Sequence, residues 1–279
     1  MITAAEEEFI ATHAYVPEHL PGYVTSISRA EPHLFGAHVC YGGRRSLIFI
    51  GYPLGSPFDA KAMMETLEAA RSRFRPGQIA LIGPAIPTNW ETHRERRRDQ
   101  YFRLDLAALT IHAKVRNMIR RASRELSLEI ARQIGEEHAC LISEFMESHD
   151  LPPDARSLYS RIPDYVSAAA TARVFNARDS AGTLVAFDLA DFGARSYAFY
   201  QFNFLARRSY VPGAADFLLH ELARAARQEG KSFLNLGLGI HPGVVKFKRK
   251  WGAAPFLPYE CCRYRSGPPG LLDAILHMR

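Results

Sequence analysis

The spacing of apolar residues predicts alternating strands and helices in the first ninety residues. The run Ser46–Ile50 is apolar and is followed by a stretch rich in Pro and Gly, which is typical of a strand that ends in a loop. Between Ala60 and Phe74 the apolar residues recur at helical spacing. Residues 78–82 form a second apolar run before Gly83. This strand, helix and strand series predicts an α/β unit.

The alternation continues after residue 100. Strands are predicted at residues 101–106, 126–132, 183–189, 196–205 and 232–238, and helices at residues 112–126, 136–149, 215–226 and 243–251. Residues 151–154 (LPPD) are expected to form a loop. We therefore expect a second α/β unit in this part of the chain.

A highly charged stretch, residues 89–100, separates the two patterns. It contains Arg94, Arg96, Arg97 and Arg98, and is interpreted as a solvated linker, with a basic binding loop as the alternative. We place the boundary here, between residues 1–95 and 96–279. The fold predicted is α/β, with two tandem units that meet near residues 90–110, each a mixed central sheet flanked by helices.

Composition and charge place only weak limits on the number of domains and on the kind of ligand. The chain has 279 residues, 47% of them hydrophobic, which is enough for one large domain or two medium ones. The net charge is +6 and the pI about 9.2, a basic excess that suits a phosphate-bearing ligand such as a nucleotide cofactor or RNA.

The sequence gives no indication of a metal site, a secretory leader or a membrane span. Its four cysteines include no CxxC pair, and its histidines show no metal-ligand spacing. The N-terminus is acidic, and no apolar run approaches the roughly 20 residues of a membrane helix. We expect a cytoplasmic protein with reduced thiols and no metal.

Two basic features could hold phosphate. Arg116, Arg120 and Arg124 lie one turn apart on the helix predicted at 112–126, where they either clamp phosphates or face solvent. Arg207 and Arg208 precede the helix that follows the aromatic strand. The free N–H groups of that helix start, beside two guanidinium groups, are suited to a pyrophosphate, although many α/β proteins have such a helix start with nothing bound.

This second feature resembles the coenzyme A loop of the GNAT (Gcn5-related N-acetyltransferase) superfamily. The family consensus is Gln or Arg, two variable residues, Gly, one variable residue, then Gly or Ala, and Arg208, Val211 and Gly213 fall on its fixed positions. Val211 replaces the first glycine of the consensus. The resemblance implies a donor-binding loop made of Arg207, Arg208, Tyr210, Val211, Gly213 and Ala214, with acyl-CoA as the superfamily's usual donor.

Two branches of the superfamily are more similar still. VRNMIRRASREL is similar to a pattern of Fem-type aminoacyltransferases, and ADFLLHELARAARQEG with FLNLGLG is similar to the soluble domain of lysyl-phosphatidylglycerol synthases. FKRKWGA resembles the Phe-Lys-x-x-Phe-Gly element of both. The match runs from about Tyr101 to Tyr259. Both branches have tandem GNAT-like units and use aminoacyl-tRNA, so residues 1–95 would be a degenerate first unit.

The resemblance implies that donor and acceptor meet where the two central strands splay apart. His241 lies in the loop after the second strand, where it could accept the proton of an attacking amine or simply meet solvent. Asn235, on an otherwise apolar strand, either orients a substrate or ties two strands together. Alternation along the aromatic strand puts Asn203 on the face of Tyr197 and Tyr200 on the opposite one. Tyr200 and Asn203 are both candidates for the cleft.

Lys248 is the candidate favoured by charge, position and resemblance together. The helix at 243–251 is expected to bury Val244, Phe247 and Trp251, which turns Lys248 away from the core and toward the cleft. The resemblance places it on the lysine that Fem-type enzymes use at the donor phosphate or the oxyanion. The alternative is an ordinary basic helix surface.

These observations predict an N-acyltransferase that moves an acyl or aminoacyl group from acyl-CoA or aminoacyl-tRNA to an amine or hydroxyl. The acceptor would be a small molecule or a lipid headgroup, and tRNA would be a partner in the aminoacyl alternative. A catalytically inactive GNAT-like protein that binds a small molecule or RNA is the competing hypothesis, and it predicts an occluded or unlined cleft.

Overall fold

A computed structural model describes residues 2–87, 90, 96–151 and 153–265. Arg94, one of the arginines of the charged stretch at residues 89–100, lies outside the described residues. The N-terminal half contains α1 (Ala4–His13), the short 3-10 helix η1 (Pro17–His19), α2 (Pro21–Ser28), β1 (Glu31–Phe35), β2 (His38–Gly42), β3 (Ser46–Ile50), α3 (Ala60–Phe74) and β4 (Gln78–Gly83). The strand, helix and strand series predicted between residues 46 and 82 is confirmed by β3, α3 and β4.

The second half adds β5 (Arg96–Asp105), α4 (Ala113–Ala122), β6 (Ser127–Ala131), α5 (Glu136–Ser148), α6 (Pro153–Ser160), α7 (Ile162–Ala168), β7 (Ala172–Arg178), β8 (Leu184–Asp191), β9 (Tyr197–Leu205), α8 (Ala214–Gln228), β10 (Phe233–Leu238), α9 (Pro242–Lys250) and β11 (Ala254–Arg265). Each strand and helix predicted after residue 100 is present. Helices α6 and α7 and strands β7 and β11 were not predicted.

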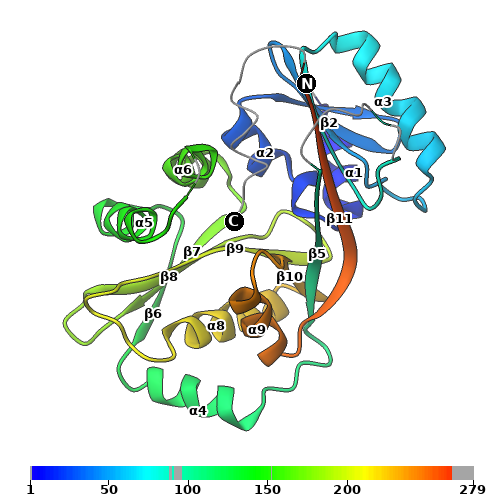
Figure 1. Cartoon of the computed structure of the whole chain (residues 1–279). Helices are drawn as coiled ribbons and strands as arrows, with labels where there is room; N and C mark the ends of the chain where they lie inside the picture. Colours follow the sequence, from blue (N-terminus) through cyan, green and yellow to red (C-terminus); the bar gives the residue numbers. More distant parts are fainter. Residues whose placement is uncertain (1, 88–89, 91–95, 152, 266–279) are drawn as a thin grey trace.

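The mixed α/β class, with helices flanking a large mixed sheet, is confirmed. Within the described residues the strands form a single 11-stranded sheet, in the order β1-β2-β3-β4-β11-β5-β10-β9-β8-β7-β6. The expectation of a separate sheet for each unit is therefore corrected. The physical reason is the length of β5 and β11, which pair with each other over most of their length and run side by side between the two halves (Figure 1).

Strand β11, although it lies near the C-terminus of the sequence, pairs with the N-terminal part of the sheet. Its residues Glu260 to Arg265 pair antiparallel with β4, while β5 pairs with β10 on its other edge. The linker interpretation of Arg96, Arg97 and Arg98 is also wrong, because these residues begin β5. Glu260 of β11 accepts ion pairs from Arg96 at 2.6 Å and from Arg98 at 2.9 Å, which offsets the repulsion within the basic run.

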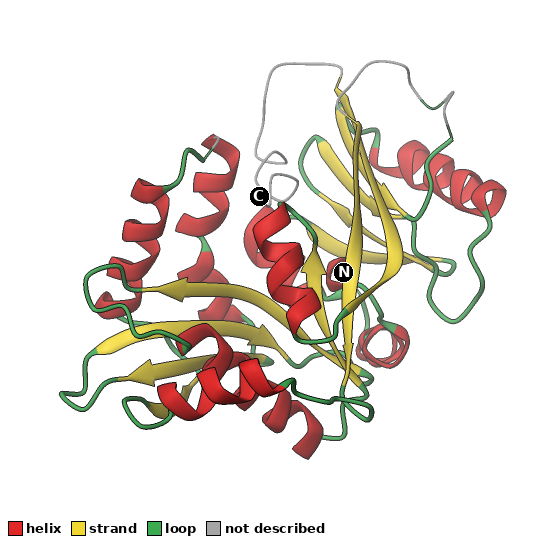
Figure 2. Ribbon diagram, turned by 60° about the horizontal axis from the view of Figure 1, so that its bottom comes forward, coloured by secondary structure: helices red, strands yellow, loops and turns green. Residues whose placement is uncertain are grey.

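Helices cover both faces of the C-terminal half of the sheet (Figures 1 and 2). The amphipathic helix α8 packs its buried leucines, including Leu218 and Leu222, against β7–β9 and α4. Each fully buried leucine contributes about 2 kcal/mol from the loss of water contact. Helices α2, α5, α6 and α7 contribute buried residues to the core on the opposite face. No helix of the described chain has the length and apolar character that crossing a membrane requires.

Candidate active site

The two central strands of the C-terminal half diverge and leave a cleft. Strands β9 and β10 are parallel, but they pair only where residues 233–235 face residues 197–199. Beyond Phe199 the backbone of β9 has no β10 partner. A cavity of about 520 Å³ opens there, which we call the cleft. Its walls are residues 200–205 of β9, Leu236 of β10, Ala215 of α8, the inner side of α9, and a rim formed by Phe145, His149, Asp150, Leu151 and Tyr159.

A β-bulge decides which side chains of β9 face α8 and α9. Leu189 of β8 pairs with Phe202, but its neighbour Ala190 pairs with Tyr200, so one extra residue, Gln201, is inserted in β9. The extra residue inverts the alternation of side chains. Asn203 therefore shares the face of Tyr200, and the prediction that it shares the face of Tyr197 is wrong. Both Tyr200 and Asn203 nevertheless line the cleft, as expected.

Asn203 is held from behind by a buried carboxyl group. Its Nδ2 donates a hydrogen bond of 2.6 Å to Oδ1 of Asp188, which is completely buried on β8. Burial raises the pKa of Asp188 well above its usual range. With Nδ2 engaged, the amide oxygen of Asn203 is the atom available to accept a hydrogen bond at the cleft. Burial also raises the pKa of Tyr200, which keeps its hydroxyl protonated and able to donate.

Lys248 is a buried basic group in the cleft wall. Its side chain is only 3% exposed, and its Nζ donates to the carbonyl oxygen of Leu238 while lying 5.5 Å from the ring centre of Phe102. Burial lowers the pKa of Lys248 to about 7, and the Asp99 carboxylate partly opposes that shift. The amine can thus gain or lose a proton near neutral pH.

The inward face of α9 differs from the expected stripe. Lys248 is the buried residue within the helix, and Trp251 at its end is also buried, whereas Val244 and Phe247 are half-buried and line the cleft. The difference arises because α9 covers the opening between β9 and β10, where the helix faces a cavity in place of a packed core. The expectation that Lys248 reaches the cleft does not depend on this detail, since it lines the cavity.

His241 and Asn235 occupy different environments. His241 is exposed at the cleft, and its Nδ1 caps α9 by accepting the Gly243 N–H at 3.2 Å. Asn235 is fully buried and does not line the cleft. Its Nδ2 donates to the Tyr15 carbonyl oxygen at 3.3 Å and its Oδ1 accepts from the Gly237 N–H at 2.9 Å. Of its two predicted roles, the geometry favours tying segments together.

The predicted phosphate loop connects two walls of the cleft, because it runs from Leu205 to Ala215. Arg208 and Tyr210 are exposed, and the Arg207 N–H donates to Glu144 at 3.2 Å. Val211 is half-buried against the core, and Ala214 is buried at the first turn of α8. None of the six predicted loop residues lines the cleft itself.

Gly213 explains why this loop contains a glycine. Its φ is +91°, and a Cβ there would lie 2.7 Å from the carbonyl oxygen of Met118 on α4. Only glycine fits both conditions. Asp216, in the first turn of α8, is balanced by the Lys250 ammonium at 2.7 Å and the Trp251 indole N–H at 2.9 Å. Of the four basic residues on α9 (Lys246, Lys248, Arg249 and Lys250), Lys250 is therefore neutralised by Asp216.

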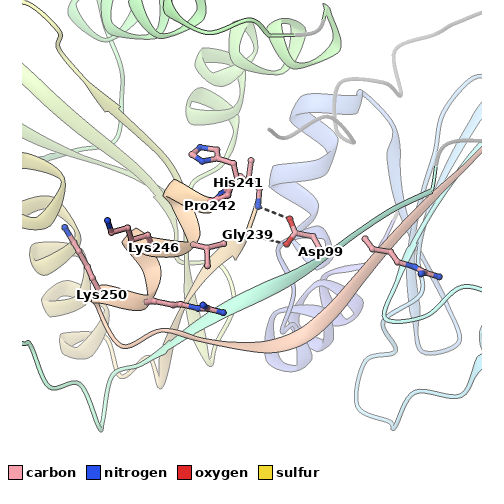
Figure 3. Close-up of a pocket in the computed structure, with 10 residues that line it drawn as sticks. Asp99, Gly239, His241, Pro242, Lys246 and Lys250 are labelled. Carbon is pink, nitrogen blue, oxygen red and sulfur yellow. Dashed lines mark hydrogen bonds between the residues drawn. The ribbon is translucent and has the colours of Figure 1, made fainter.

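A second, more open hollow of about 840 Å³ lies along the outer side of α9. It shares Ile240 and His241 with the cleft. Figure 3 shows Asp99 of β5 reaching the backbone of the turn that precedes α9, whereas Lys246 and Lys250 point away from it. Asp99 was missed by the sequence reasoning, and the one signal for it is a lone carboxylate after three arginines.

The predicted row of three arginines is broken because α4 ends at Ala122, before Arg124. Arg116 and Arg120, both on α4, line a hollow of about 580 Å³, and Arg124 does not line it. The proposed three-residue clamp is therefore reduced to two arginines. In the described residues, no group of three or more His, Cys, Asp or Glu side chains is arranged to hold a metal ion.

No protein-family model and no curated protein matches the sequence. Solved structures do. The C-terminal domain of a proposed lysylphosphatidylglycerol synthetase from Agrobacterium fabrum is 18% identical, with a TM-score of 0.63 over 99% of this chain and 96% of that one. FemX is 12% identical, with a TM-score of 0.65 over 93% and 96%. A tandem GNAT protein from the clavulanic acid pathway is 14% identical, with a TM-score of 0.51 over 95% of each chain.

These similarities extend over nearly the whole length of each chain. At such low identity they establish the fold alone. The chain has a GNAT-like fold, related to the folds of FemX and of the lysylphosphatidylglycerol synthetase domain.

Proposed function

We propose that the protein is an acyltransferase that uses the cleft between β9 and β10. The observation that carries the proposal is the position of Lys248, a buried amine with a pKa of about 7, in the wall of an open cavity at the point where the strands separate. Perturbed titratable groups in concave sites are enriched among functional residues. The cavity also has hydrogen-bonding groups from Tyr200 and Asn203.

In the proposed reaction an amine nitrogen or a hydroxyl oxygen attacks the acyl carbonyl carbon. The new C–N or C–O bond forms as the C–S or C–O bond to the carrier breaks, and the nucleophile's proton passes to a base while the carrier leaves as a thiolate or alkoxide. His241 is suited to accept that proton, and the Tyr200 hydroxyl to protonate the leaving group. The protonated Lys248 would stabilise negative charge on the carbonyl oxygen, together with backbone N–H groups on the edge of β9 that has no β10 partner beyond Phe199.

Two carriers fit this chemistry. The exposed Arg208 and the free N–H groups at the start of α8 suit the pyrophosphate of acyl-CoA. The arginines of α4 and the basic side of α9 suit the backbone of an aminoacyl-tRNA. The similar structures do not favour one carrier over the other. One is named a lysylphosphatidylglycerol synthetase domain, which suits an aminoacyl donor, and the name of another mentions acetyl-CoA, which suits an acyl-CoA donor. The acceptor is proposed to be an amine or hydroxyl on a small molecule or lipid headgroup, and the reaction is placed in the cytoplasm.

The division at residue 95 belongs to the same proposal. Residues 1–95 would be a degenerate GNAT-like unit and residues 96–279 the catalytic one, as in a tandem GNAT protein. On this assignment the catalytic unit supplies β11 to the sheet of its neighbour. The competing hypothesis of an inactive binding protein predicts an occluded or unlined cleft, and an open cavity whose mainly apolar walls include Tyr200, Asn203 and Lys248 favours the enzyme.

A thermal-shift screen against CoA, a set of acyl-CoAs and bulk tRNA tests the proposal. A ligand that binds only the native state at 100 times its Kd stabilises it by about 2.7 kcal/mol. We expect one carrier class to raise the Tm and to support transfer to an amine in a follow-up assay. No shift with any carrier, in a protein that unfolds cooperatively, would contradict the acyltransferase assignment.

A further inference from the structure

A carboxylate from β5 holds the turn that leads into α9. Oδ1 of Asp99 accepts the Gly239 N–H at 3.0 Å, and Oδ2 accepts the Ile240 N–H at 2.9 Å. Oδ1 also accepts the N–H of Gln100 at 2.7 Å. Both carboxylate oxygens are thus engaged by backbone donors, and two of these three donors belong to the turn between β10 and α9 (Figure 3).

The same turn carries the hydrogen bond of Lys248. The Lys248 Nζ donates to the carbonyl oxygen of Leu238, and that carbonyl belongs to the same peptide unit as the Gly239 N–H. One rigid peptide unit therefore has Asp99 on its N–H side and Lys248 on its C=O side. A carboxylate on the N–H side and an ammonium on the C=O side polarise the peptide in the same sense, so the two contacts strengthen each other.

The turn would be costly without Asp99. Ile240 has a φ of +60°, which is unfavourable for a β-branched residue. A Cβ on Gly239 would lie 2.7 Å from Oδ1 of Asp99, so the residue at this position must be glycine for the carboxylate to approach. Local backbone strain of this kind persists only where the surrounding contacts fix it, and here the fixing contacts come from Asp99.

We propose that Asp99 is a positioning residue for Lys248: it fixes the peptide unit between Leu238 and Gly239, and the carbonyl of that unit holds the Lys248 ammonium in the cleft wall. The role in catalysis rests on the proposed acyltransferase function, but the positioning itself does not. Asp99 lies on the strand between the two halves of the sheet, so the proposal makes that strand part of the active site.

Other titratable groups lie near Lys248, and the test must separate the effect of Asp99 on the Lys248 titration from theirs. His241 at the N-cap of α9, Tyr200 on β9, and His149 and Asp150 after α5 line the same cleft. Asp216 on α8 is engaged by Lys250 and Trp251. Asp99 on β5 is the charge that raises the pKa of Lys248 against the effect of burial.

The test is the titration of Lys248 followed by NMR of protein labelled with ¹⁵N-lysine, with the signal identified by its loss in Lys248→Arg. In Asp99→Asn we expect the Lys248 pKa to move down, because the opposing charge is gone and the peptide is free to turn. Asp105→Asn is the matched control. It lies on the same strand, and its carboxylate also accepts two backbone N–H groups, from Ala107 and Ala108, away from the cleft. We expect it to leave the titration unchanged.

Gly239→Ala disturbs the contact between Asp99 and the turn without removing the carboxylate, because the added Cβ would lie 2.7 Å from Oδ1 of Asp99. It replaces Asp99→Asn if that variant is too unstable to titrate. We expect the same downward movement of the Lys248 pKa. A Lys248 titration that is the same in wild type, Asp99→Asn and Gly239→Ala overturns the proposal. Because the titration needs no substrate, this result is distinct from a failure to find acyl transfer. Where transfer is measured, Asp99→Asn should lower kcat by about 10²-fold with KM nearly unchanged, the scale of a small misplacement of a catalytic group.

Discussion

Asn203 on β9 donates its amide to the buried carboxyl group of Asp188 on β8, and it can do so only because of the bulge at Gln201. Without that extra residue, Asn203 would face the opposite side of the sheet from Tyr200. The bulge therefore brings two polar side chains of one strand to a common face, and the Asp188 contact sets which atom of the Asn203 amide faces the cleft.

Replacing Asn203 tests whether its amide oxygen contacts the substrate. Asn203→Ala should lower kcat/KM by about tenfold, the effect of losing one neutral hydrogen bond. Asn176→Ala is the control, because Asn176 is also buried and hydrogen-bonded, to His138 at 3.0 Å, but lies outside the cleft. Steady-state kinetics and the Tm of both variants separate the two effects. If Asn203→Ala and Asn176→Ala lose the same stability and also the same activity, a contact between Asn203 and the substrate is contradicted.

Glu18 should make the stability of the protein depend on pH. It is buried, accepts the Tyr101 hydroxyl at 2.6 Å, and burial raises its pKa from 4.5 to about 7. The folded state binds the proton more tightly, so the stabilising contribution is full below pH 4.5 and is lost as the pH rises to 7. The loss is about 3 kcal/mol.

Urea unfolding of Glu18→Gln between pH 4.5 and 7.5 checks this expectation. The variant keeps a neutral acceptor for Tyr101, so its stability should fall less with pH than that of the wild type. Glu7→Gln, at an exposed position of α1, should follow the wild type. Parallel curves for all three proteins would show that Glu18 ionises in the folded state without the expected penalty.

Arg208 is the test of the donor loop. Its side chain is exposed and makes no ion pair within the described part of the chain, so Arg208→Ala should leave the Tm unchanged. If acyl-CoA is the carrier, CoA binding should weaken roughly 10- to 100-fold, because a charge-assisted contact to phosphate is lost. Calorimetry measures the affinity, with Arg224→Ala, farther along α8, as the control. An unchanged CoA affinity would remove the loop from the binding site.

If tRNA is the carrier, salt gives a separate prediction. The binding constant should fall steeply as the salt concentration rises, because phosphate contacts release counterions. Filter binding at several salt concentrations measures the slope. An affinity that does not change with salt would exclude the basic faces of α4 and α9 as an RNA-binding surface.

Periodicity predicted most of the core elements, because helices such as α8 bury a regular stripe of apolar side chains. It missed β11, whose two prolines and two cysteines obscure its alternation, and this strand turned out to join the two halves. It also predicted a solvated linker for Arg96, Arg97 and Arg98, because Glu260, which pairs with Arg96 and Arg98, lies more than 160 residues away along the chain. Pairings of that range leave no local signal.

Site residues could be predicted where a local sequence motif or the strand pattern singled them out. Lys248 and Tyr200 do line the cleft, and the resemblance or the strand pattern pointed to both. Asp99 was not predictable, because its role depends on a turn from another part of the sheet. The face of Asn203 was mispredicted for a similar reason: a single bulge inverts the alternation, and nothing in the sequence of β9 marks where it occurs.

The pH dependence of kcat offers a check on the charge of Lys248. If the protonated amine stabilises the transition state, the wild type should lose activity as the pH rises through about 7. Lys248→Arg should move that loss to higher pH, since a guanidinium group stays charged. A wild-type kcat that keeps rising above pH 8 would instead indicate that the neutral amine is the active form.

The most decisive measurement compares kcat for Lys248→Ala and Lys250→Ala. The two lysines lie two residues apart on α9, but Lys248 is buried at the cleft whereas Lys250 pairs with Asp216. Removing a group that stabilises developing charge costs roughly 10²–10³-fold. We expect that loss for Lys248→Ala and a kcat close to that of the wild type for Lys250→Ala. Small, equal effects in both variants would contradict the role of Lys248 and leave α9 as a basic helix without a part in the reaction.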